Sequence, residues 1–69
     1  MAYAAGVDVG STQTKAVVID EEKNIVGRAL IDTGANVVIA AEQSFAEALK
    51  NANAREEEVE YVEEDDSVV

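Results

Sequence analysis

The first 31 residues contain three apolar runs separated by connections of only a few residues, and this spacing is the strongest constraint on the fold. The runs are Tyr3–Val9, Thr14–Asp20 and Ile25–Ile31, and their alternating or β-branched apolar residues are typical of β-strands. Strands joined by such short turns pair antiparallel, because a parallel pair needs a long crossover connection. The sequence therefore predicts a three-stranded antiparallel meander.

The hydrophobic period changes from two to 3.6 after a polar break at residues 32–36. This change predicts one helix over residues 37–53, capped at its start by Thr33 or Asn36. A short strand, Val59–Val62, follows, and a strand reached through a crossover helix is expected to lie parallel to a strand of the meander. The expected core face of the helix is a stripe of apolar residues, namely Val38, Ala41, Phe45, Leu49 and Ala52.

The predicted element order is therefore β-β-β-α-β, an α/β domain over residues 1–62. Gly27, inside the third strand, is expected to mark a bulge or a close approach of another backbone. Residues 63–69, EEDDSVV, are expected to form an acidic, disordered tail. The net charge of −10 is concentrated toward this end, because residues 56–69 hold eight acids and no base.

The composition excludes several kinds of site. The chain has no Cys and no His, so it supplies no disulfide, no thiolate zinc or iron–sulfur ligand and no imidazole base. It has no basic stripe, which argues against a nucleic-acid partner. No apolar run approaches the ~18–20 residues of a membrane span, and no basic region precedes the apolar N-terminal stretch. We therefore expect a cytoplasmic protein without a membrane partner.

The segment DVGSTQTK, residues 8–15, joins the first predicted strand to the second and carries the sharpest chemical signal. Gly10 lets the backbone turn tightly and approach a ligand closely. Ser11 and Thr12 supply hydroxyls beside amide N–H groups that can converge on phosphate oxygens. Lys15 adds a positive charge at the mouth of the turn. These residue types predict a cradle for nucleotide phosphates.

A carboxylate at Asp8, beside the expected phosphates, indicates a hydrated Mg²⁺ between the acid and the anion. The segment matches neither the P-loop nor the dinucleotide fingerprint. Asp, Gly and Ser also favour ordinary hairpin turns, and Lys15 could serve as an exposed charge on an edge strand. A purely structural hairpin is therefore the alternative interpretation.

The stretch from Gly6 to Asp20, GVDVGSTQTKAVVID, resembles the first phosphate-binding hairpin of the actin/Hsp70/sugar-kinase ATPase superfamily. Its S-T-x-T-K form is similar to one branch, which holds the ATPase subunits of benzoyl-CoA reductase and the activators of 2-hydroxyacyl-CoA dehydratases. The similarity extends to Val62. It implies a ribonuclease-H-like (actin-like ATPase) lobe, of which this chain would be an N-terminal fragment.

The resemblance also implies ATP and Mg²⁺ as cofactors, with Asp8 positioning the metal and its water shell. The implied nucleotide contacts are Asp8, Gly10, Ser11, Thr12, Thr14 and Lys15. Such ATPases deliver low-potential electrons from a [4Fe–4S] cluster to an acyl-CoA reductase or dehydratase component. The cluster would belong to the full-length parent only, since this chain has no cysteine ligands.

Two other functions stay open at this stage. One is the N-terminal lobe of a sugar kinase of the same superfamily. The other is a small non-catalytic interaction module, natural or engineered, whose cradle binds nothing. In every case the chain alone is expected to be inactive as an ATPase, because half a cradle leaves a nucleotide mostly in water. An isolated lobe would also expose a sheet face, from which we expect self-association.

Overall fold

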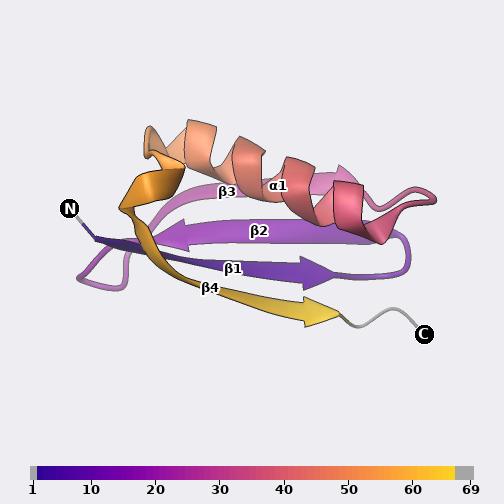
Figure 1. Ribbon diagram of the computed structural model, residues 1–69, viewed down its shortest axis with the longest axis horizontal. Helices are drawn as coiled ribbons and strands as arrows, with labels where there is room; N and C mark the ends of the chain where they lie inside the picture. The colour runs from indigo at the N-terminus through magenta and orange to yellow at the C-terminus, as the bar shows by residue number, and fades with distance from the viewer. Residues whose placement is uncertain (1, 67–69) are drawn as a thin grey trace.

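A computed structural model describes residues 2–66 as a sheet covered on one face by a helix (Figure 1). The described strands are β1 (Tyr3–Val9), β2 (Gln13–Ile19), β3 (Ile25–Asp32) and β4 (Val59–Asp66). Helix α1 (Val37–Ala52) follows β3, and one turn of 3-10 helix, η1 (Glu56–Glu58), leads into β4. The predicted α/β class and the order β-β-β-α-β are confirmed.

The sheet has the strand order β3-β2-β1-β4. β1 pairs antiparallel with β2, and β2 pairs antiparallel with β3, so the predicted meander is correct. β4 lies parallel to β1, as expected for a strand reached through a crossover helix. The β1–β2 turn and the β3–α1 loop consequently meet at one end of the molecule, on the right in Figure 1.

β4 is longer than the sequence predicted. We expected the strand to end at Val62, but its pairing with β1 continues from Glu63, opposite Gly6, to Asp66, opposite Val9. Ladder hydrogen bonds are made by the main chain, so β1 can hold an acidic segment whose composition alone indicated solvation. Of the predicted tail, residues 67–69 lie outside the described part of the chain.

Helix α1 has a side-chain cap at its start and a left-handed residue at its end. The Oδ1 atom of Asn36 accepts hydrogen bonds from the amides of Val38 (3.0 Å) and Ile39 (3.1 Å). Asn53 has φ 56°, and its N–H donates to the carbonyl oxygen of Lys50 at 3.1 Å. Of the two predicted N-caps, Asn36 is therefore correct.

The face of α1 that meets the sheet differs from the predicted stripe at one position, because Val38 is 61% exposed. Ala41 and Leu49 are buried as expected, and Phe45 and Ala52 are partly buried against the core. The buried helix residues are mostly small, namely Ala40, Ala41, Ser44, Ala48 and Leu49. Small residues let the helix approach the sheet closely, so the helix turns this face inward and leaves a larger side chain outside.

Gly27 marks both a close approach of another backbone and an irregularity in strand pairing, as predicted. A Cβ atom on Gly27 would lie 2.6 Å from the Cβ of Ala52, and it would also collide with the carbonyl oxygen of Ala48. The β2–β3 register shifts beside this glycine, since Val18 is opposite Gly27 but Ile19 is opposite Ile25. This irregularity and the missing side chain allow α1 to lie directly on β3.

The core lies between α1 and the sheet. Its buried apolar residues are Ala5, Val7, Val9, Ala16, Val18, Ala41, Ala48 and Leu49. No element within residues 2–66 covers the opposite face of the sheet (Figure 1), where Leu30 and Tyr61 are more than half exposed. The self-association expected from such a face stays a prediction. None of the described helices is long and apolar enough to span a membrane.

Candidate functional site

The turn between β1 and β2 is tight and depends on a glycine. The N–H of Gly10 donates to the carbonyl oxygen of Gln13 at 2.9 Å. A Cβ atom on Gly10 would lie 2.8 Å from that oxygen, closer than real side chains approach. Ser11 and Thr12, at the tip of the turn, are exposed. The turn therefore exposes to solvent the two hydroxyls and the backbone of Ser11 and Thr12, which follow Gly10.

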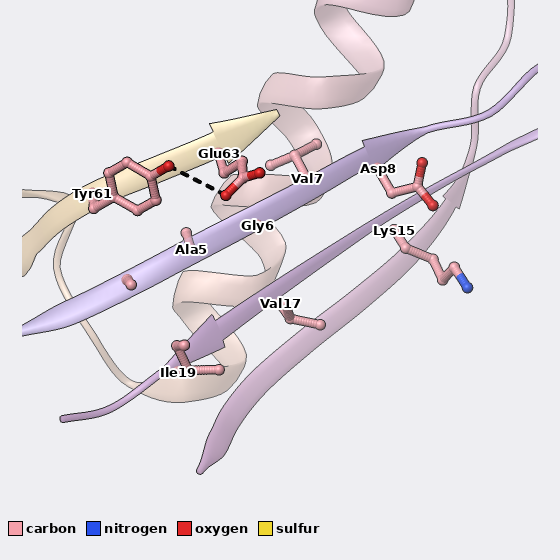
Figure 2. Close-up of a pocket in the computed structure, with 10 residues that line it drawn as sticks. Ala5, Gly6, Val7, Asp8, Lys15, Val17, Ile19, Tyr61 and Glu63 are labelled. Carbon is pink, nitrogen blue, oxygen red and sulfur yellow. Dashed lines mark hydrogen bonds between the residues drawn. The ribbon is translucent and has the colours of Figure 1, made fainter. Parts of the chain in front are cut away.

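Two charged side chains lie behind this turn on the uncovered face of the sheet. Asp8 of β1 and Lys15 of β2 are direct cross-strand partners, and both are exposed. Figure 2 shows them side by side near the end of the hairpin that leads to the turn. The pair places one negative and one positive group next to the hydroxyls of the turn, which suits an anion that carries a metal cation.

Asp8 and Lys15 stand at one end of a shallow hollow of about 470 Å³ on the uncovered sheet face (Figure 2). The hollow is mainly apolar, and its floor is formed by small or aliphatic side chains of β1 and β2. Its lining residues include Ala4, Gly6, Val17, Ile19 and Tyr61. The charged residues predicted for the site thus border a concave surface.

At the β4 side of the hollow, the hydroxyl of Tyr61 donates to a carboxylate oxygen of Glu63 at 3.2 Å (Figure 2). This hydrogen bond, together with the negative charge of Glu63 and a small contribution from burial, raises the pKa of Tyr61 above its ordinary value of 10.0. The phenol is therefore neutral and serves as a donor at neutral pH.

The structure separates Thr14 from the other five predicted site residues. Its side chain is 0% exposed and lies on the helix-covered face of the sheet, with its hydroxyl 2.8 Å from that of Thr33. Asp8, Ser11, Thr12 and Lys15 are exposed at the turn, and Gly10 forms its base. The hydroxyl of Thr14 is not placed to contact a ligand at the surface.

Thr33 is the residue that the sequence reasoning missed. The Oγ1 atom of Thr33 donates to the carbonyl oxygen of Gly10 at 2.7 Å, and its backbone N–H donates to the carbonyl oxygen of Thr12 at 2.9 Å. The available signal was a hydroxyl residue between Asp32 and Gly34, which we interpreted only as a possible helix cap.

Among residues 2–63, whose side chains the structure describes, no three side chains of His, Cys, Asp or Glu lie together as a set of metal ligands. Asp8 nevertheless offers one carboxylate beside the turn. Mg²⁺ bound with a nucleotide usually keeps several waters and takes one or two carboxylates together with phosphate oxygens. The groups present at this end of the sheet fit that kind of binding.

Residues 5–63 match the model of the BadF/BadG/BcrA/BcrD ATPase family. The (R)-2-hydroxyglutaryl-CoA dehydratase activating ATPase of Acidaminococcus fermentans is 35% identical over 57 residues, which are 83% of this chain and 22% of that protein. The crystal structure of (R)-2-hydroxyglutaryl-CoA dehydratase component A from the same organism has a TM-score of 0.77 at 31% identity. The structural match covers 90% of this chain and 24% of the component A chain. This chain therefore spans about a quarter of the length of these relatives or less.

Proposed function

The chain belongs to the BadF/BadG/BcrA/BcrD ATPase family, and from that premise we propose that its β1–β2 hairpin binds the phosphates of Mg²⁺–ATP. The observation that supports this most directly is the exposed turn with the Asp8–Lys15 cross-strand pair behind it. A turn with two hydroxyls and a neighbouring cation can bind a phosphate chain, and the neighbouring acid can take a hydrated metal.

The roles of the residues follow from their places in the hairpin. The backbone amides and hydroxyls of Ser11 and Thr12 donate hydrogen bonds to phosphate oxygens. Gly10 keeps the turn closed, because a side chain there would collide with the Gln13 carbonyl. Lys15 adds a compact positive charge that stabilises the phosphates. The buried hydroxyl of Thr14 supports the hairpin from the helix-covered side of the sheet.

Asp8 would hold the Mg²⁺ of the nucleotide through the water shell of the metal. The nucleotide supplies the phosphoanhydride bond and the metal supplies charge neutralisation, while this chain binds and orients them. Asp8 would be unfavourable beside a bare phosphate, because two negative groups repel each other. We therefore expect binding of the metal complex to be preferred over binding of metal-free ATP.

For the whole protein we propose ATP-dependent activation of a 2-hydroxyacyl-CoA dehydratase, with a benzoyl-CoA reductase as the other candidate partner. The family match and the activating-ATPase relative support this over a sugar kinase. In this proposal ATP hydrolysis drives low-potential electrons from a [4Fe–4S] cluster to the acyl-CoA enzyme. The cluster ligands would lie outside these 69 residues, which contain no Cys.

The proposal is tested by following backbone amide resonances while Mg²⁺–ATP is added to millimolar concentration. We expect saturable shifts at residues 10–15, weaker shifts with metal-free ATP, and little response to Mg²⁺–AMP, which lacks the β and γ phosphates. Absence of any localised shift with Mg²⁺–ATP would instead support the non-catalytic interaction module.

A matched pair of variants makes the test specific. Lys15→Gln removes the positive charge beside the turn, whereas Lys50→Gln removes the same charge from the far end of α1. We expect Lys15→Gln to weaken the Mg²⁺–ATP response about tenfold, in line with the loss of one charge-assisted contact. Lys50→Gln should leave it close to wild type. Equal responses of the two variants would contradict the proposed site.

A further inference from the structure

We propose that Thr33 is the positioning residue of the phosphate turn, holding the Gly10–Gln13 backbone in its ligand-binding shape from the β3–α1 loop. Its two hydrogen bonds reach the turn at two points, the carbonyl oxygens of Gly10 and Thr12. The proposal rests on the proposed function only in naming this turn as the ligand site. Thr33 would act on the backbone and not on the nucleotide itself.

The donors and acceptors among Thr14, Thr33 and Gly10 can be assigned because each threonine hydroxyl has a single hydrogen. The hydroxyl of Thr33 has one hydrogen, which it donates to the carbonyl oxygen of Gly10. In the 2.8 Å contact between the hydroxyls of Thr14 and Thr33, Thr14 must therefore be the donor. The result is a directed chain from Thr14 through Thr33 to Gly10, in which both threonines are almost fully buried.

The conformation of the turn is consistent with support from outside the hairpin. Two-residue hairpin turns that match the twist of a sheet are types I′ and II′, and both require a residue with positive φ. Positive φ values occur at Lys23, Gly34 and Asn53 among residues 2–66, and none of these lies in the turn. The turn is therefore of neither type, and the hydrogen bonds from Thr33 add contacts from outside the hairpin to the internal bond between Gly10 and Gln13.

Thr33 is well suited to this role by its own place in the fold. It follows β3, whose last residues pair with the start of β2, and it is 5% exposed. Asn36, three residues later, begins α1. The hydroxyl of Thr33 is thus carried by a segment that is fixed by a strand on one side and a helix on the other, as a rigid support requires.

The test compares Thr33→Val, which keeps the shape but removes the hydroxyl, with Thr33→Ser, which keeps the hydroxyl. Ser44→Ala is the matched control, because it removes another buried hydroxyl, bonded to Ala41 within α1, without touching the turn. Two readouts are used: hydrogen exchange of the Gly10 amide, and Mg²⁺–ATP affinity from the amide shifts. Thermal unfolding of all three variants records their global stability.

We expect Thr33→Val to accelerate exchange at Gly10 and to weaken Mg²⁺–ATP binding, each by about tenfold relative to Ser44→Ala. Thr33→Ser should restore both. The positioning role is overturned if Thr33→Val matches Ser44→Ala in both readouts, or if exchange accelerates without loss of affinity. A wild-type chain that shows no Mg²⁺–ATP shifts would refute the proposed function, while exchange at Gly10 would still decide whether Thr33 holds the turn.

Discussion

Gly27 of β3 lies beneath Ala52 of α1 with no room for a methyl group between them, since a Cβ on Gly27 would come to 2.6 Å from that of Ala52. The helix approaches the sheet closely at this point because its inner face is built from small residues. The contact also fixes how α1 is rotated, and so it decides which helix residues enter the core.

Gly27→Ala should therefore destabilise the fold, because α1 would have to move away from β3. We expect the free energy of unfolding to fall by about 1–3 kcal/mol, the usual cost of overpacking. Urea unfolding measures this directly. Gly6→Ala is the control, since its added Cβ would meet Val17 at an ordinary contact distance of 3.6 Å. A Gly27→Ala variant as stable as Gly6→Ala would show that the close approach is not required.

Gly10→Ala should act on the turn and not on the core. The added methyl group would press against the Gln13 carbonyl at 2.8 Å, so the hydrogen bond that closes the turn must lengthen. We expect Mg²⁺–ATP affinity, measured by amide shifts, to fall about tenfold, which corresponds to about 1.4 kcal/mol. Gly6→Ala should bind like wild type, and a Gly10→Ala variant that also does so would contradict the role of this glycine.

Asn36→Ala should weaken the start of α1. The side chain of Asn36 caps the amides of Val38 and Ile39, and its loss leaves both without this acceptor. We expect a loss of about 1 kcal/mol in unfolding free energy, measured by chemical denaturation. Asn36→Asp should retain the cap and add a favourable charge at the helix start, where no acidic residue lies in the first turn. A destabilised Asn36→Asp variant would argue against capping as the cause.

The Tyr61–Glu63 hydrogen bond makes a prediction about alkaline pH. The folded-state pKa of Tyr61 is raised above 10.0, chiefly because its hydroxyl donates to Glu63. A raised pKa stabilises the folded chain below the unfolded value, and this stability is lost as the pH rises above 10.0 through the folded value. Ultraviolet titration of tyrosinate in Glu63→Gln should show a lower pKa for Tyr61, with Tyr3 as the internal reference. An unchanged titration curve would refute the attribution to Glu63.

Local sequence pattern was sufficient to predict the order of the four strands and of helix α1. The bounds of β1 were predicted correctly, and so were the parallel pairing of β4 and the cap at Asn36. The bounds of β1 and the cap depend on residues close together in the chain, namely alternation within a strand and one side chain that reaches amides two or three residues away. The pairing of β4 with β1 joins distant residues and followed from the rule for strands connected by a crossover helix. The cluster of Asp8 and Lys15 followed from the same local reasoning, because a hairpin pairs its own neighbours.

The sequence by itself thus determined a β-β-β-α-β chain with a chemically distinctive first hairpin. Only the tertiary structure decided that Val38 faces solvent, that the hydroxyl of Thr14 is buried, and that the hydroxyl of Thr33 bonds to the turn. The physical reason is that these outcomes depend on partners 19 to 23 residues away in the chain and on the rotation of α1 over Gly27. No periodicity within a single element contains that information, since it arises when the helix and the sheet pack together.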